Sequence, residues 1–288
     1  MTRHDDHSAS GAGKFMIGGD LAVNRIGFGA MRLTGPGVWG DPDDREGAKK
    51  VLHRALELGV NFVDTADAYG PETNENLIRE ALYPYPEDVL VATKGGHIRD
   101  NDKNWLPDGR PEHLERACEA SMKRLGVEQI ELYQFHRPDP DVPYEESIGA
   151  LAELRSEGKV LHVGVSNVNV EQLETARSIV PIASVQNRYN ITERNADDLV
   201  DACERAGIAF LPYFPLKTGD LAKPGGPLDE VAEKRGASAG QVALAWLLHR
   251  SPVMIPIPGT SSVDHLKENV AAASLSLGMG EMRALNAA

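Results

Sequence analysis

Four residues of types that can move a proton occur in the first half of the chain: Asp64, Tyr69, Lys94 and His136. A tyrosine hydroxyl ordinarily has a pKa of about 10, which is too high for efficient proton transfer at neutral pH. A lysine beside it would favour the phenolate, and an aspartate paired with that lysine would keep the lysine charged. A histidine would add a second hydrogen-bond donor. Together they could deliver a proton to a carbonyl oxygen, although each alone is as compatible with an ion pair or a buried structural histidine.

The stretch from 61 to 70, NFVDTADAYG, indicates how two of these residues are placed. It begins with apolar, β-favouring residues, turns abruptly polar at Asp64, and ends on Tyr69 and a Gly-Pro pair that indicates a turn. This pattern is typical of a buried strand that runs out into a loop. In a barrel of parallel strands, catalytic side chains gather at that end of the strands. The alternative is that Asp64 caps the next helix and Tyr69 packs on the surface.

Alternating strand and helix patterns continue along the chain. After a hairpin turning at Gly18-Gly19 and a first strand, all within residues 14–31, we expect strands at 61–64, 88–94, 130–136, 160–167, 183–190, 208–216 and 252–259. Periodicity and Gly or Pro punctuation predict helices at 45–59, 75–82, 111–126, 144–158, 170–179, 196–207, 238–250 and 263–273. A polar loop is expected at 95–109, and a Gly- and Pro-rich break at 217–227.

Strands that alternate with helices predict a parallel sheet, and eight such units in about 250 residues predict a closed barrel. The competing fold is an open doubly wound sheet, which usually has a Gly-rich turn after its first strand. The segment GFGAMRLTG lacks the G-x-G-x-x-G spacing, so the barrel is preferred. We therefore expect an α/β protein: a single (β/α)8 TIM barrel with an N-terminal β-hairpin at 14–288, preceded by a disordered tail at 1–13.

Composition limits the partners. The net charge of −13 disfavours binding to nucleic acid or to an anionic membrane surface. No apolar run approaches the roughly 20 residues that span a bilayer, and the N-terminus lacks the apolar core of a secretory signal. The two cysteines, Cys118 and Cys203, lie in helical patterns without metal-ligand spacing. We expect them to be reduced, in a cytoplasmic protein that holds no metal.

The carboxyl ends of the predicted strands carry polar residues at almost every position. A closed barrel brings these ends to one face, and polar groups there are costly to bury without partners. A binding site therefore explains them better than chance does. The residues are Asp64 with Tyr69, Lys94, His136, Ser166 with Asn167, Gln186 and Tyr213.

Six motifs in this series resemble those of the aldo-keto reductase superfamily, over nearly the whole chain. They are DTADAYG at 64–70, TKGG at 93–96, QFHRPD at 134–139, GVSN at 164–167, QNRYN at 186–190 and IPGTSSVDHLKEN at 257–269. The resemblance implies that the catalytic tetrad of the family falls on Asp64, Tyr69, Lys94 and His136, with none substituted. It also implies a reduced nicotinamide cofactor lying extended across the mouth of the barrel.

The resemblance assigns the cofactor contacts as well. The carboxamide would meet Ser166, Asn167 and Gln186, and the nicotinamide ring would stack on Tyr213. Phe214, where a small polar residue is usual, and Leu216 follow in the same segment. The adenosine 2′-phosphate and the adenine would be gripped by Gly259, Thr260, Ser261, Ser262, His265, Glu268 and Asn269.

Two departures from the family pattern bear on the choice of cofactor. Many members carry Lys where this chain has Gly259 and Arg where it has His265, so permanent positive charge is missing at the 2′-phosphate position. Hydroxyls and backbone amides at a helix start can still bind a phosphate. We expect NADPH, with NADH less favoured, and we expect the affinity for NADPH to rise as pH falls toward about 6, because a histidine gains charge there.

The substrate is less constrained than the cofactor. Met31, Trp39, His97, Trp105 and Lys217 lie in segments expected to surround the nicotinamide. The chain ends soon after its last predicted helix, so the pocket is expected to be open. The segments GPGVWG, REALYPYPEDVLVATK and QVALAWLLHRSPVMIPIPGTSSV resemble a bacterial subgroup that includes pyridoxal reductases. We expect a monomer acting on a small-molecule carbonyl substrate, in which Tyr69 donates the proton.

Two other function classes compete with a carbonyl reductase. One is a regulatory subunit that keeps the cofactor, because potassium-channel β subunits resemble this fold. The acidic surface and the lack of a long interaction extension argue against it. The other is a (β/α)8 lyase or metal hydrolase, which ranks last because no cluster of His and carboxylate ligands lies at the predicted strand ends.

Overall fold

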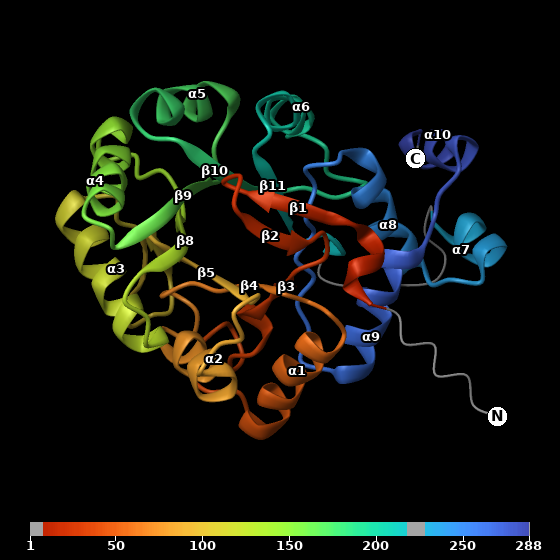
Figure 1. Ribbon diagram of the computed structural model, residues 1–288, viewed down its shortest axis with the longest axis horizontal. Coiled ribbons are helices and arrows are strands. Elements are labelled where there is room, and N and C mark those ends of the chain that lie inside the picture. The colour runs from red at the N-terminus through yellow and green to blue at the C-terminus, as the bar shows by residue number, and fades with distance from the viewer. Residues whose placement is uncertain (1–7, 218–227, 288) are drawn as a thin grey trace.

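Seven parallel strands curve round a common axis in a computed structural model that describes residues 8–217 and 228–287 (Figure 1). Neighbours in the sheet follow the order β11-β10-β9-β8-β5-β4-β3. Their bounds are Phe28–Gly29 (β3), Phe62–Asp64 (β4), Leu90–Gly95 (β5), Ile130–Phe135 (β8), Val160–Ser166 (β9), Ile182–Arg188 (β10) and Ala209–Tyr213 (β11). Every pairing along this sheet is parallel, as the alternation of strands and helices predicted.

The eighth position of the barrel is filled by an extended segment instead of the strand predicted at 252–259. On one side, the Ile255 amide donates to the Phe210 carbonyl over 2.9 Å. On the other side, the Gly27 amide donates to the Pro256 carbonyl over 3.0 Å. Because Pro256 has no N–H of its own, a regular ladder cannot form there. The segment thus closes the barrel without being a regular strand.

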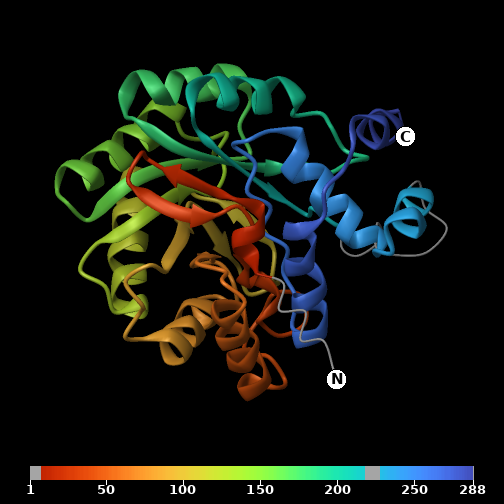
Figure 2. The ribbon, with the colours of Figure 1, turned by 45° about the vertical axis from the view of Figure 1, so that its right-hand side comes forward.

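Helices surround the barrel and connect its strands. Their bounds are Arg45–Glu57 (α1), Thr73–Leu82 (α2), Pro111–Leu125 (α3), Tyr144–Ser156 (α4), Val170–Ile179 (α5), Asp197–Ala206 (α6), Ala239–Arg250 (α8) and Val263–Ala271 (α9). Local sequence signals set several of their ends. Pro111 occupies the first turn of α3, and Gly126 ends it with a left-handed φ of 74°. Figure 2 shows α9 beside α1, so the helical ring closes where the two ends of the barrel sheet meet.

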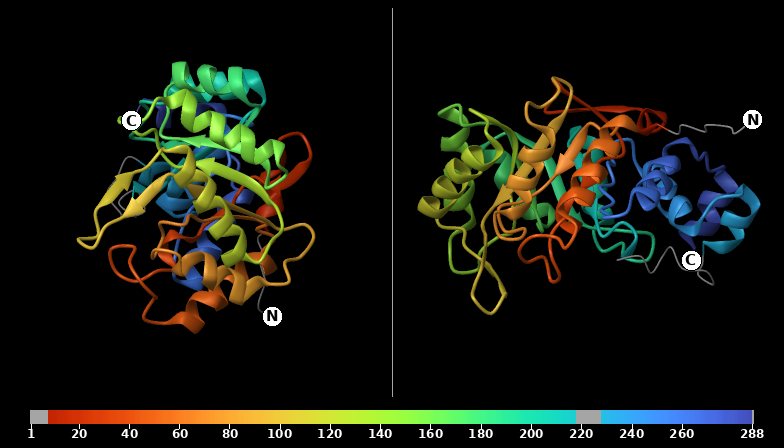
Figure 3. Two further views of the ribbon diagram at one scale, coloured as in Figure 1. Left: turned by 90° about the vertical axis from the view of Figure 1, so that its left-hand side faces the viewer. Right: turned by 90° about the horizontal axis from the view of Figure 1, so that it is seen from below.

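Several elements were not predicted. The expected polar loop at 95–109 carries an antiparallel hairpin, β6 (His97–Arg99) and β7 (Trp105–Pro107), because few apolar residues mark this ribbon in the sequence. Two short helices, α7 (Asp229–Arg235) and α10 (Met279–Asn286), lie together beyond the barrel in the right-hand view of Figure 3. The break expected at 217–227 lies outside the described residues except for Lys217.

The tail predicted as disordered at 1–13 needs a correction. Residues 1–7 lie outside the described residues, but Ala9–Ala12 forms a 3-10 helix, η1. The Ser8 hydroxyl caps η1 by accepting from the Ser10 amide, and Ala9 is fully buried. The Ala9 amide also donates to the Leu58 carbonyl over 2.9 Å. The burial of Ala9, the cap from Ser8 and this backbone hydrogen bond therefore order a segment whose composition indicated disorder.

The predicted N-terminal hairpin is present, as β1 (Lys14–Ile17) and β2 (Leu21–Asn24). It crosses the amino-terminal end of the barrel (Figure 1). Ile17 and Val23 on the hairpin pack with Phe62 and Leu132 on the strands, in a small apolar cluster inside the barrel. A larger apolar core lies between the strands and the helices. The hairpin end of the interior is therefore apolar, which leaves the opposite end for polar side chains.

No helix among the residues described here has the length and the apolar character to cross a membrane.

Candidate active site

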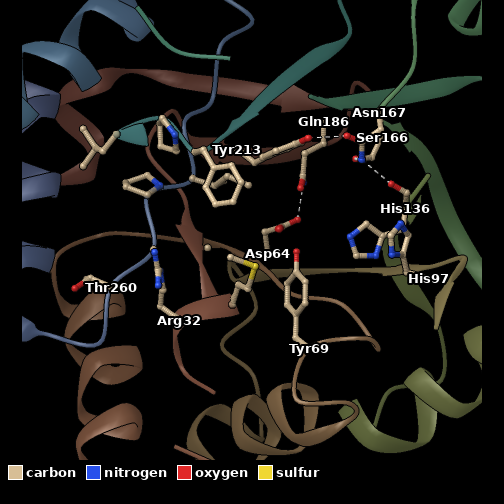
Figure 4. A pocket seen from close by; sticks show the side chains of 18 of the residues that line it. Arg32, Asp64, Tyr69, His97, His136, Ser166, Asn167, Gln186, Tyr213 and Thr260 are labelled. Atoms are coloured by element: carbon tan, nitrogen blue, oxygen red, sulfur yellow. Dashed lines mark hydrogen bonds between the residues drawn. The ribbon is translucent and has the colours of Figure 1, made fainter. Parts of the chain in front are cut away.

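A cavity of about 1060 Å³ opens at the carboxyl ends of the strands (Figure 4). Most of the site residues predicted from the sequence line it. These are Met31, Asp64, Tyr69, His97, Trp105, His136, Ser166, Asn167, Gln186, Tyr213, Phe214, Leu216, Gly259, Thr260, Ser261, His265, Glu268 and Asn269. The barrel therefore brings together residues that are spread over more than two hundred positions of the chain.

Lys94 lies fully buried behind the cavity wall, at the centre of a polar cluster. Its ammonium donates to the Asp64 Oδ1 over 2.6 Å and to the Thr65 carbonyl over 2.8 Å. It also lies 3.3 Å from the Tyr69 hydroxyl oxygen. The predicted contacts of Lys94 with Asp64 and Tyr69 are therefore present. Lys94 does not line the cavity itself, but its partners Asp64 and Tyr69 do.

The second carboxylate oxygen of Asp64 accepts two hydrogen bonds. Gln134 donates to Oδ2 over 3.0 Å and Gln186 donates to it over 2.9 Å. Gln186, predicted to contact the carboxamide of the cofactor, thus uses its side-chain NH2 group to donate to Asp64. Gln134, fully buried near the end of β8, was missed, although it stands at a strand end in the motif QFHRPD. Asp64 can stay ionised inside the barrel because each oxygen accepts hydrogen bonds.

Lys94 lowers the pKa of Tyr69, as predicted, but the net shift of that pKa is upward. Burial raises the pKa of Tyr69, and the nearby Lys94 ammonium only partly offsets this effect. The pKa of Lys94 is itself raised, because contacts with Asp64 and Tyr69 outweigh the burial that opposes its charge. Tyr69 therefore holds its proton at neutral pH, next to a permanent positive charge. This is the state expected of a proton donor.

His136 lies across from Tyr69, with 5.8 Å between the ring centroids. Burial, followed by the repulsion of Lys94, holds the pKa of His136 well below its usual range. The imidazole is therefore neutral near pH 7, and it offers a hydrogen bond without a charge. Burial also lowers the pKa of the neighbouring His97 to about 4.

Asn167 is held rigidly between two strand ends. It adopts a left-handed φ of 60°, which asparagine tolerates better than most residues. Its side-chain amide donates to the His136 carbonyl over 2.9 Å and to the Ser166 hydroxyl over 3.0 Å. The Tyr213 hydroxyl donates to its Oδ1 over 2.6 Å. The three predicted contacts Ser166, Asn167 and Tyr213 thus form one connected group on the cavity wall (Figure 4).

The hairpin β6–β7 forms one side of the cavity. Trp105 lies 6.2 Å from Tyr69 and 5.6 Å from His97, measured between ring centroids. Trp39, predicted as a pocket residue, is not among the lining residues, because it packs instead under the Arg99 guanidinium, 5.3 Å from it. Lys217 does not line the cavity either.

The other end of the cavity is formed by the segment 257–269. Thr260 is buried and its hydroxyl accepts from the Ser262 amide over 3.0 Å. Ser262 does not line the cavity, because its hydroxyl caps α9 by accepting from the His265 amide over 3.4 Å. The start of α9 and its neighbouring hydroxyls offer donors suited to an anion.

Arg32 also lines this end, and sequence reasoning missed it. It lies in η2 (Ala30–Arg32), directly after β3, and Figure 4 shows it near Thr260. A basic residue just after the first barrel strand was a possible signal, but nothing in the sequence showed that it would face the segment 257–269. The cavity therefore has proton donors at one end and phosphate-binding groups at the other, which fits an extended, phosphate-bearing cofactor.

Comparisons with known proteins agree with this arrangement. Residues 25–288 match the model of the aldo/keto reductase family. An uncharacterized oxidoreductase of Schizosaccharomyces pombe is 50% identical over 269 residues, covering 93% of this chain and 87% of that protein. Pyridoxine 4-dehydrogenase of Escherichia coli is 47% identical over 265 residues, covering 90% of this chain and 92% of that enzyme.

Solved structures show the same fold. Glycerol dehydrogenase of Gluconobacter oxydans superposes with a TM-score of 0.86 at 29% identity, covering 96% of this chain and 94% of that one. An aldo-keto reductase of Klebsiella pneumoniae in complex with NADPH superposes with a TM-score of 0.80 at 25% identity, covering 95% and 94%. The chain described here belongs to the aldo/keto reductase family.

Proposed function

We propose that this protein reduces the carbonyl group of an aldehyde or ketone with NADPH, and that Tyr69 is the proton donor. The observation that carries the proposal is the position of the Tyr69 hydroxyl, 3.3 Å from the Lys94 ammonium and on the wall of the cavity. Two relatives, one named as an oxidoreductase and one as pyridoxine 4-dehydrogenase, support the same reaction class. The NADPH complex of the Klebsiella pneumoniae structure supports the choice of cofactor.

The residues of the chain account for the proton step. As negative charge develops on the carbonyl oxygen, the Tyr69 hydroxyl donates its proton and becomes a phenolate. Lys94 stabilises that phenolate, and Asp64 keeps Lys94 charged and in place. Neutral His136 donates a second hydrogen bond to the same oxygen. NADPH, when bound, supplies the hydride for the carbonyl carbon.

The cofactor contacts follow the two ends of the cavity. At the proton-donor end, Ser166, Asn167 and Gln186 would orient the carboxamide, and the Tyr213 ring would support the nicotinamide. The rigid hydrogen bonding of Asn167 supports this role, since orientation needs a fixed partner. Phe214 and Leu216 would contact the cofactor in the segment that follows Tyr213. At the other end, the phosphate and adenosine contacts would come from Gly259, Thr260, Ser261, Ser262, His265, Glu268 and Asn269, with Ser262 acting through the start of α9.

For the substrate, we propose a small aldehyde held against Met31, His97 and Trp105. The aromatic wall of the β6–β7 hairpin supports a planar substrate, and the likeness to pyridoxine 4-dehydrogenase supports pyridoxal as the first compound to test. A cytoplasmic location remains a prediction that rests on the two free cysteines, Cys118 and Cys203. The monomeric state is a prediction as well.

Tyr69→Phe tests the reaction, with Tyr133→Phe as a matched control. Tyr133 is also buried, but it does not line the cavity and its hydroxyl has no hydrogen-bond partner among the described residues. We expect kcat for pyridoxal or another activated aldehyde to fall by about 10² or more in Tyr69→Phe and to stay near wild type in Tyr133→Phe.

Cofactor binding, followed by fluorescence, should survive in both variants. Near-wild-type turnover by Tyr69→Phe would overturn the assignment of the proton donor. Wild-type protein that binds NADPH but reduces no member of an aldehyde panel would favour the regulatory-subunit alternative.

A further inference from the structure

Arg32 is an exposed cation beside the cofactor cavity with no stabilising role visible in the fold. Its guanidinium has no hydrogen bond or ion pair with the described residues, although its side chain lines the cavity. Its Cγ lies 3.6 Å from the position that a Cβ on Gly259 would occupy. The Arg32 stem therefore runs past the point where a side chain of residue 259 would begin. Figure 4 shows Arg32 near Thr260.

Position 259 cannot carry a cation of its own in this backbone. A Cβ at Gly259 would lie 2.4 Å from the Gly29 carbonyl oxygen, much closer than such atoms approach. The contact is between two backbones, and the Gly29 amide donates to the Pro258 carbonyl over 3.4 Å beside it. Relief would require the closing segment of the barrel to move. A positive charge at this place must therefore come from another element.

The segment 257–269 offers little permanent positive charge of its own toward the cavity. Thr260 and Ser261 contribute hydroxyls, and Glu268 contributes a carboxylate that would repel a phosphate. Lys267 does not line the cavity, and its ammonium lies 3.5 Å from Asp264.

Across the described residues, Arg32 and Arg137 are the arginines that line the cavity, and no lysine lines it. Arg137 belongs to the other end, where it donates to the Asn167 side chain over 3.3 Å. Of the residues that the structure describes, Arg32 is thus the permanent cation at the end of the cavity that holds Thr260 and the start of α9.

We infer that Arg32 binds the 2′-phosphate of NADPH and sets the preference for NADPH over NADH. This inference rests on the proposed function. A guanidinium presents several N–H donors in a plane and pairs well with phosphate oxygens, so it can replace a cation on the facing segment. NADH lacks this phosphate and therefore gains nothing from Arg32 at this position.

Binding of both cofactors to Arg32→Gln tests the inference without using turnover. Dissociation constants for NADPH and NADH can be measured by quenching of tryptophan fluorescence, since Trp105 lines the cavity. We expect Arg32→Gln to weaken NADPH binding by about 10- to 100-fold, the scale of a lost hydrogen bond to a charged group, and to leave NADH binding within about twofold. Arg32→Lys should retain part of the preference.

Arg137→Gln is the matched control, because it removes an exposed arginine from the other end of the same cavity. It should leave the ratio of the two dissociation constants near the wild-type ratio. Added salt should weaken NADPH binding more in wild type than in Arg32→Gln, because the lost contact is between charges.

Three results would overturn the inference. Equal weakening of NADPH and NADH in Arg32→Gln would mean that Arg32 acts on groups that both cofactors share. Unchanged dissociation constants for both cofactors would mean that the preference arises elsewhere. Wild-type protein that binds neither cofactor would instead refute the proposed function, and this inference with it. Because Arg32 is exposed and has no partner among the described residues, we expect Arg32→Gln to melt with wild type.

Discussion

Two ion pairs lie buried on opposite sides of the same strand, and only one of them reaches the cavity. Inside the barrel, Lys94 contacts Asp64 over 2.6 Å. Outside it, Arg124 contacts Glu75 over 2.5 Å. They meet at β5, where Lys94 faces inward and its neighbour Thr93 faces outward and donates to Glu75 over 2.6 Å. The two distances are nearly equal, and none of the four side chains is more than 12% exposed, so neither distance nor burial identifies the active site.

The difference lies in what else each pair touches. One carboxylate oxygen of Glu75 accepts from Thr93 and the other accepts from Arg124. The outer pair therefore connects α2 to β5 and α3, and both oxygens of Glu75 are engaged in these structural contacts. The inner pair has a further partner, Tyr69, which carries its influence to the cavity. A buried charge becomes a candidate for catalysis when a titratable neighbour faces a space that a substrate can enter.

Removing the inner cation should have the largest effect on activity. Lys94→Met deletes the charge that would stabilise the Tyr69 phenolate, so we expect kcat for aldehyde reduction to fall by about 10³-fold or more. Cofactor binding should change little, because Lys94 does not line the cavity. Single-turnover kinetics with saturating NADPH would measure the loss. Activity within about tenfold of wild type would show that Lys94 is structural like Arg124.

Removing the outer cation should affect stability instead. Arg124→Met leaves the fully buried Glu75 without its charged partner, and breaking a buried pair in this way costs about 3 to 5 kcal/mol. Urea denaturation would measure the decrease in the free energy of unfolding, and kcat per folded molecule should stay near wild type. Arg177→Met is the control, because its ion pair with Glu174 lies on the surface and should contribute little. A large drop in kcat at full folding would contradict the comparison.

The sequence predicted the inner pair better than the outer one. Asp64 and Lys94 end apolar runs, so their place at the carboxyl end of the barrel follows from strand patterning alone. Glu75 looks like an ordinary polar helix residue, and its burial depends on how α2 packs against β5 and α3. Gln134 was missed for the same reason, since its partners Asp64 and Gln186 come from distant segments. Arg32 was missed because nothing in the sequence showed that it would face the segment 257–269.

Directions of electrostatic effects were also hard to predict from residue types. Types alone suggested that Lys94 would lower the pKa of Tyr69, but burial, which depends on the whole fold, outweighs that effect. The closing segment 252–259 shows a different limit of the sequence-based prediction, which here concerns secondary structure. Its apolar pattern predicted a strand correctly in position, while its prolines removed the donors that a regular ladder needs.

Lowering the pH should destabilise the cavity side of the barrel, with a smaller effect than either substitution. His97 and His136 lie on the cavity side, and both are held neutral by burial. The pKa of His97 is lowered to about 4, so between pH 6.5 and pH 4 the unfolded chain takes up a proton there that the folded chain refuses. Stability is therefore unaffected by this group above pH 6.5 and is lost as pH falls below it, by up to about 3 kcal/mol.

Comparing His97→Leu with wild type by urea denaturation at pH 7 and pH 4.5 tests this expectation. Neither ring nitrogen of His97 has a hydrogen-bond partner among the described residues, so replacing the ring with a leucine leaves no partner unsatisfied. The variant should lose about 2 to 3 kcal/mol less than wild type between the two pH values, because no proton uptake remains at that position. His53→Gln, at an exposed site on α1, should follow wild type. Parallel losses in wild type and His97→Leu would show that the acid sensitivity belongs to other groups, and that the cavity side is no more vulnerable to protonation than the outer wall.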